Sequence, residues 1–225
     1  MVAVRKQMNL HAAIKEIYGS EAECDGILNP SLYDAAPLRI LWLLREPWFT
    51  GAWKLLKGNG VYSRIGGSPT LHPIIYVTYS IFHGFPRWRD MDWIRDDPVM
   101  AEVLRSIAYI NVKKCAGGTA SNLQDIYDWF KKGEGVIRQQ VCDCTPDVIV
   151  GCRPYMRDLF RWDSSRSRPV EEAPLSFVSD PDKPLLVEAP HPSWRGGRGI
   201  YVDSIVSAVE REVGRKPKHN VRRPR

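Results

Sequence analysis

Four short apolar runs, separated by longer amphipathic stretches, constrain the fold more than any other feature of this sequence. Proline, glycine or charged residues bound each run, as expected for strands that are buried on both faces. The runs are Leu38 to Leu44, Ile107 to Val112, Asp147 to Gly151 and Leu185 to Glu188. Stretches typical of helices lie between and after them, at 69–82, 98–106, 121–141, 153–161 and 201–213. This alternation predicts a layered α/β fold whose core is a parallel sheet.

Length and hydropathy indicate one globular domain. The chain has 225 residues, of which 44% are hydrophobic, enough to bury one core, and we expect residues 1–213 to form it. No apolar run approaches the roughly 18 to 20 residues that span a bilayer, so a membrane protein is excluded. The N-terminal segment lacks the apolar core and cleavage site of a secretory signal, which predicts a cytoplasmic protein.

The positive charge is concentrated at the C-terminus. The formal net charge is +6, and residues 214–225 hold six basic residues and no acid. Without these six, the 32 basic residues fall to 26, equal to the 26 acidic ones. We therefore expect a neutral body and a disordered basic tail. The tail would suit binding to phosphates, and it would equally suit a solvated chain end.

The five cysteines do not form a recognisable framework. Their number is odd and their spacing irregular, which favours reduced thiols over disulfides. Cys142, Cys144 and Cys152 have a spacing that would in principle allow zinc binding, but thiols at helix ends and in buried strands explain them better. We expect no metal and no cofactor.

Three of the predicted strands end at or just before side chains that could take part in catalysis or ligand binding. Glu46 follows the first strand, Asn111 ends the second, and His191 follows the last, between two prolines that stiffen its backbone. Ligands of open α/β sheets bind at this carboxyl edge. Taken singly, each residue also has an ordinary explanation: a solvated or helix-capping glutamate, an asparagine in a turn, and a histidine in a loop.

Together, these segments resemble the motifs of the uracil-DNA glycosylase superfamily. Leu44-Arg45-Glu46-Pro47-Trp48 takes the place of a motif of the form Gly-Gln-Asp-Pro-Tyr, and Asn111-Val112-Lys113-Lys114-Cys115 is similar to Asn-Val-Val-Lys-Cys. His191-Pro192-Ser193 matches His-Pro-Ser, and 145–151 resembles the family's Pro-x-Val-Ile-Val-x-Gly strand. The resemblance covers residues 38–213. It implies a three-layer sandwich with a central four-stranded parallel sheet flanked by helices.

The resemblance also implies an activity. A monomeric, cofactor-free, monofunctional DNA glycosylase would hydrolyse the N-glycosidic bond of a flipped-out uracil or modified pyrimidine, leaving an abasic site. Glu46 would activate the water, Asn111 would read the base, and His191 would stabilise the departing base. In the same family comparison, Tyr62 would stack on the base and Trp48 would line its pocket.

The loop after His191 is the expected DNA contact. Ser193 begins this DNA-binding loop, Arg198 and backbone amides would hold phosphates, and either Trp194 or Arg195 would fill the gap left by the flipped nucleotide. Trp194 has an equally good explanation as a partly buried anchor of the loop.

Several departures from the family pattern leave the substrate open. Leu44 and Arg45 stand where small or amide residues are usual, Glu46 is longer than Asp, and only Cys115 matches a ligand of the family's iron–sulfur branch. The chain has eight tryptophans and an insertion at 84–97, which suggest a reshaped or enlarged pocket. A bulky modified base, such as a hypermodified phage cytosine, would suit such a pocket, and the role would then be antiviral defence instead of DNA repair.

Two other function classes stay open. One is a catalytically inactive DNA-binding module of the same fold. The other is a different α/β enzyme that acts on free nucleotides or nucleosides, although the common phosphate-loop signatures are not present.

Overall fold

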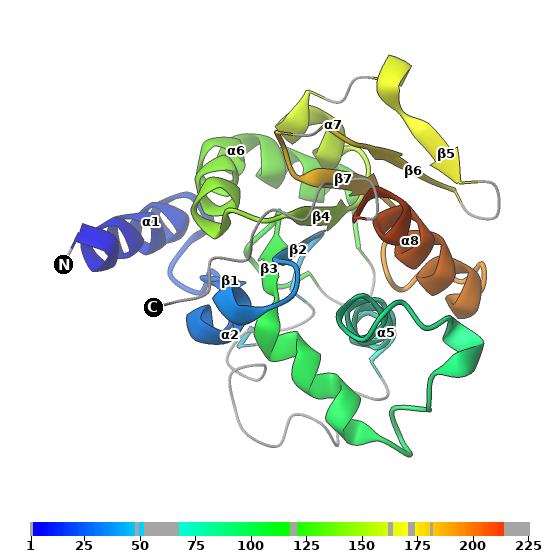
Figure 1. The fold of residues 1–225 in the computed structure, drawn as a ribbon. Coiled ribbons are helices and arrows are strands. Elements are labelled where there is room, and N and C mark those ends of the chain that lie inside the picture. The colour runs from blue at the N-terminus through cyan, green and yellow to red at the C-terminus, as the bar shows by residue number, and fades with distance from the viewer. Residues whose placement is uncertain are drawn as a thin grey trace.

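A seven-stranded mixed sheet organises the protein, seen here in a computed structural model (Figure 1). The structure describes residues 2–47, 50–51, 68–117, 121–161, 164–170, 174–180 and 182–213. Across the sheet, the strands follow the order β1-β3-β2-β4-β7-β6-β5. None of the helices within these ranges is long and apolar enough to cross a bilayer.

The middle of the sheet consists of β3 (Ala108–Asn111), β2 (Ile40–Leu44), β4 (Val148–Gly151) and β7 (Leu185–Glu188), which arise from the four apolar runs. β2 pairs in parallel with β3 on one side and with β4 on the other, and β4 pairs in parallel with β7. All five residues of β2 are buried. The carboxyl ends of these neighbours therefore lie along one edge of the sheet.

The sheet is larger than the four parallel strands expected from the sequence. β1 (Gly26–Ile27) adds to β3, and β6 (Leu175–Val178) and β5 (Arg168–Val170) follow β7, in each case antiparallel. Residues 162–183, for which the sequence predicted neither a helix nor a strand, thus contain two strands. β5 (Arg-Pro-Val) exposes its first two residues, and a serine interrupts the apolar run of β6 (Leu-Ser-Phe-Val), so neither has the continuous apolar signature of a buried strand.

Helices cover both faces of the sheet (Figure 1). α6 (Leu123–Cys144) and α7 (Tyr155–Phe160) pack on one face, and α1 (Val2–Tyr18), which the sequence analysis did not predict, packs on α6. α5 (Leu71–Phe82) and α8 (Arg198–Val213) pack on the other face. The expected helix at 98–106 is the 3₁₀ helix η2 (Pro98–Ser106), which packs on α5. The shorter helices are α2 (Pro30–Ala35), η1 (Trp88–Asp90) and η3 (Ser164–Arg166).

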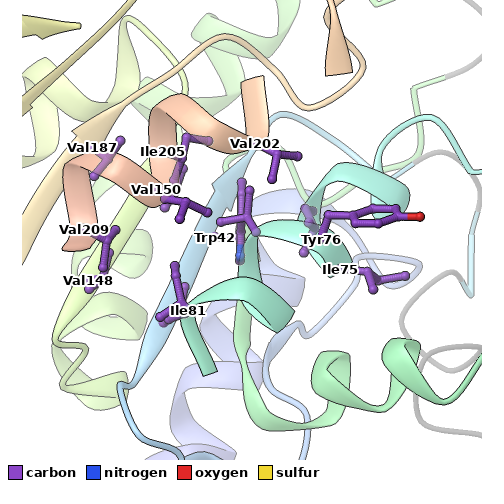
Figure 2. Packing of buried hydrophobic residues seen from close by; sticks show 14 of the residues in the cluster. Trp42, Ile75, Tyr76, Ile81, Val148, Val150, Val187, Val202, Ile205 and Val209 are labelled. Atoms are coloured by element: carbon purple, nitrogen blue, oxygen red, sulfur yellow. The ribbon is translucent and has the colours of Figure 1, made fainter. Parts of the chain in front are cut away.

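Alternating side chains of β2 supply two apolar cores. Ile40, Trp42 and Leu44 face α5 and α8, whereas Leu41 and Leu43 face α6 and α7. Figure 2 shows Trp42, which is 1% exposed, among apolar side chains of the neighbouring strands and helices. Because β2 is buried on both faces and paired on both sides, the backbone at its carboxyl end has little freedom to move.

Two glycines of α6 provide a test of how α1 docks. A Cβ at Gly133 would overlap the Tyr18 phenol, whose hydroxyl donates to the Val112 carbonyl oxygen at 3.0 Å, whereas a Cβ at Gly135 would meet open space. We expect Gly133→Ala to lower the free energy of unfolding by about 1–3 kcal/mol. Gly135→Ala should raise it by about 0.5–1 kcal/mol, since alanine favours helix. Urea denaturation measures both, and equal stabilisation by the two variants would contradict this packing.

Candidate active site

Chemically active side chains line the carboxyl edge of the parallel strands. Asn111 ends β3, Glu46 follows β2, and His191 follows β7. One strand, β4, separates β2 from β7, so their ends lie roughly 10 Å apart at about 4.8 Å per strand spacing. Main-chain bonds continue beyond the strands: the Lys113 N–H donates to the Arg45 carbonyl oxygen and the Ala189 N–H to that of Gly151, both at 2.9 Å. The exit segments are thereby held side by side.

The Glu46 carboxylate is buried and anchored. Its side chain is 7% exposed, and Lys113 Nζ donates to Oε2 at 3.0 Å. Lys113 also donates to Asp125 in the first turn of α6, at 2.7 Å. Burial works to lower the pKa of Lys113, but its bonds to Asp125 and Glu46 outweigh burial and raise it. A Cβ at Gly117 would overlap the Glu46 carboxylate, so this glycine makes room for it.

His191 is a neutral imidazole with a defined tautomer. Burial, helped by the positive charge of Arg45, lowers its pKa to about 4. The Ser193 N–H donates to Nδ1 at 3.3 Å, and Ser193 Oγ lies 2.8 Å from the same nitrogen. Nδ1 is therefore the acceptor, and the ring proton is on Nε2. At neutral pH, His191 offers an N–H donor without a positive charge.

Asn111 is held in a buried polar cluster. Its side chain is 2% exposed, and its Nδ2 donates to Asp25 Oδ2 at 3.1 Å. Asp25 also forms an ion pair with Lys114 at 2.5 Å, and both of these side chains are fully buried. Burial lowers the pKa of Lys114 although the Asp25 charge opposes the shift. Asp25 was not predicted, because a single carboxylate before a two-residue strand matches no motif.

A small cavity opens beside the edge, on the side of α6 and α7. Its volume is about 320 Å³, and it is lined by Arg45, Leu123, Gln124, Tyr127, Arg153, Pro154 and Tyr155. Within the part of the chain that the structure describes, the buried Nε of Arg45 has no hydrogen-bond partner. Burial raises the pKa of Tyr155 to about 12. The Arg45 charge opposes this rise, and the Glu46 charge adds to it. Because Arg45 also acts on His191, the side chains of Arg45, Glu46, Tyr155 and His191 share one electrostatic neighbourhood.

Of the DNA contacts expected in the loop after His191, some are exposed and one is packed against the core. Ser193, Arg195 and Arg198 are exposed. Trp194 is partly buried against the core, near the Tyr201 ring, and a Cβ at Gly196 would overlap its indole. In this structure, Trp194 packs as an anchor of the loop, and Arg195 projects from it.

A second buried carboxylate at the edge was missed by sequence reasoning. Glu188, the last residue of β7, is fully buried and forms ion pairs with Arg153 and Arg157. The two arginines sit four residues apart around the start of α7, a spacing that also suits an ordinary surface helix. Trp48, Tyr62 and the tail 214–225, all assigned roles above, lie outside the described residues.

Comparisons with protein-family models, with curated proteins and with solved structures gave no match for this chain. Membership of the uracil-DNA glycosylase superfamily therefore stays a prediction that rests on the motif residues. Within the described residues, no three His, Cys, Asp or Glu side chains gather in a way that could hold a metal ion.

The state of His191 can be measured directly. We expect ¹⁵N NMR to show the Nε2–H tautomer at pH 7 and a protonation midpoint near 4, because burial and Arg45 disfavour the imidazolium. The unfolded chain protonates near pH 6.5, so His191 should destabilise the fold as the pH falls from about 6.5 towards 4. A midpoint above 6 would contradict a neutral donor.

Proposed function

We propose that this protein is a monofunctional DNA glycosylase of the uracil-DNA glycosylase superfamily, built on the three-layer sandwich of that family. It hydrolyses the N-glycosidic bond of a flipped-out uracil or modified pyrimidine and leaves an abasic site. It acts as a monomer and needs no cofactor.

The observation that carries this proposal is the placement of Glu46 and His191. A buried carboxylate and a neutral N–H donor follow two parallel strands of one sheet, with a single strand between them. Breaking a glycosidic bond builds positive charge on the sugar and negative charge on the base. A span of roughly 10 Å between the strand ends suits a nucleoside bound with its sugar at Glu46 and its base towards His191.

Glu46 acts on the sugar side. As the C1′–N1 bond breaks, both electrons leave with the base, and the carboxylate stabilises the resulting oxocarbenium-like sugar. Lys113 binds Oε2, so Oε1 orients the water whose oxygen forms the new bond to C1′. Gly117 keeps the carboxylate in this position, because any larger residue would displace it.

His191 acts on the base side. Its Nε2–H donates to the oxygen on which the negative charge of the departing base develops. A neutral imidazole suits this task, since it keeps its proton while it stabilises the charge. The proton released by water then neutralises the base.

The exposed loop and the edge cavity contact DNA in this proposal. Arg195 is exposed on the loop and enters the gap in the base stack, whereas Trp194 anchors the loop by packing near Tyr201. Arg198 and Ser193 bind phosphates, and Arg45 and Arg153 in the edge cavity add positive charge beside them.

One observation favours a second candidate, a DNA-binding module of the same fold that cuts no bond. Lys113 already occupies one oxygen of Glu46, and Asp25 occupies the amide nitrogen of Asn111. In a binding module these contacts would be structural.

A matched pair of substitutions separates the two candidates. Lys113 binds both Glu46 and Asp125, so Glu46→Gln and Asp125→Asn each remove one carboxylate charge next to the same ammonium. We expect Glu46→Gln to slow base release by roughly 10²- to 10⁴-fold with unchanged DNA affinity. Asp125→Asn should keep the rate of base release within about threefold of that of the unmodified protein.

The readout is mass spectrometry of bases released from DNA panels containing uracil, hydroxymethyluracil and glucosylated cytosine, with an alkaline nicking control for abasic sites. No release from any panel would favour the binding module, and equal losses in both variants would assign Glu46 a structural role.

The role proposed for Arg195 can be tested by comparing duplex and single-stranded substrates. Arg195→Ala should slow release from duplex DNA by about tenfold and leave single-stranded DNA within about twofold, because only a duplex has a gap to fill. Arg105→Ala is the control, since Arg105 is an exposed arginine of η2 at the opposite edge of the sheet. Equal losses on both substrates would instead indicate that Arg195 binds phosphate.

A further inference from the structure

Arg45 is a partly buried cation with unused hydrogen-bonding capacity. Its Nε is buried without a hydrogen-bond partner among the residues that the structure describes. No ion pair between described residues includes Arg45 either. A buried donor without a partner is costly, and native structures rarely keep one without a purpose. The Arg45 guanidinium is therefore available to a ligand of opposite charge.

The carboxylates at this edge of the sheet are committed to other cations. Lys113 Nζ lies 3.0 Å from Glu46 Oε2 and 2.7 Å from Asp125 Oδ2. Glu188, which is fully buried, forms ion pairs with two arginines at the start of α7. In the described part of the chain, these pairs leave Arg45 without a counter-ion.

The edge cavity is the space that a counter-ion from outside would occupy. Arg45 and Arg153 both line it, and its described lining includes no acidic side chain. Leu123 and Gln124, the first two residues of the long helix α6, also line it, so the positive end of the α6 dipole lies at the cavity. Its volume of about 320 Å³ is at the lower end of the range for ligand pockets, which suits a small anionic group.

We infer that the edge cavity binds one phosphate group through Arg45, and that in the DNA complex this group is a backbone phosphate next to the flipped nucleotide. The inference deepens the proposed function and rests on it for the source of the phosphate.

Two arguments favour a phosphate of the substrate strand. The planar guanidinium of arginine presents pairs of N–H donors that match two oxygens of a phosphate. Arg45 directly precedes Glu46, the residue proposed to act on the sugar, and every internal sugar of a DNA strand carries a phosphate on each side. A strand whose sugar lies at Glu46 therefore brings a phosphate close to Arg45.

Inorganic phosphate tests the site without DNA. Together with burial, the Arg45 charge lowers the pKa of His191 to about 4, so an anion beside Arg45 should raise it. We expect phosphate to move the His191 protonation midpoint from near 4 to about 4.5 or above, measured by side-chain ¹⁵N NMR against chloride at equal ionic strength. Arg45→Gln should raise the midpoint by itself and abolish the response to phosphate.

Arg157→Gln is the matched control for Arg45→Gln. Arg157 is an arginine of the same edge that pairs with Glu188 but does not line the cavity. This variant should keep the response of His191 to phosphate. A midpoint that phosphate leaves unchanged in the unmodified protein, or a response that survives in Arg45→Gln, would overturn the inference.

A neutral backbone linkage identifies the phosphate in DNA. Duplexes would carry an unreactive tetrahydrofuran abasic analogue, with a methylphosphonate placed in turn at each flanking position. In the unmodified protein and in Arg157→Gln, one position should weaken binding by about tenfold. In Arg45→Gln the same position should change binding by less than about twofold, because the cation that it would contact is already gone. Fluorescence anisotropy measures the affinities.

The outcomes separate the phosphate site from the glycosylase. A response to inorganic phosphate without a sensitive DNA position would support the site and overturn the DNA backbone as its source. Equal losses at every position in the unmodified protein and in Arg45→Gln would overturn it as well. None of these measurements needs base release, so inactivity on every base panel would contradict the glycosylase and leave the phosphate site in place.

Discussion

The parallel pairing of β3, β2, β4 and β7 is the constraint on which the rest of the structure depends. It brings three segments that are far apart in the chain to one edge, in the order Asn111, Glu46, His191. β2 lies at the centre of this group, apolar on both faces and paired on both sides, so the residue that follows it is held firmly. A slip of one residue in its register would turn Trp42 away from its core and move Glu46 with it.

Buried charge at this edge is balanced locally. Glu46 is paired with Lys113, Asp25 with Lys114, and Glu188 with Arg153 and Arg157. The adjacent lysines, which follow β3, serve different carboxylates. Removing one member of such a pair would leave a buried charge uncompensated, which costs more than the pair contributes. The polar groups of the site are thus positioned by neighbours that themselves need not touch substrate.

The sequence predicted the elements with strong periodicity and missed those defined by tertiary contacts. The four apolar runs became β2, β3, β4 and β7, since fully buried strands have a clear apolar signature. The strands β1, β5 and β6 were missed because β1 has two residues, and polar residues or proline break the apolar pattern of β5 and β6. Likewise, Glu46, Asn111 and His191 stood out at strand ends, whereas Asp25 and Gly117 gain their importance from side chains distant in sequence. No local pattern encodes such contacts.

The central claim is that these three side chains meet around one nucleotide. A crystal structure of the Glu46→Gln variant bound to duplex DNA, carrying one copy of the base that the release panel identifies as the substrate, tests it most directly. The account predicts a flipped nucleotide whose C1′ lies between residue 46 and His191, with the edge of its base within hydrogen-bond distance of the Asn111 side chain. An intact duplex lying elsewhere on the protein, or a flipped base that contacts only one of the three residues, would contradict it.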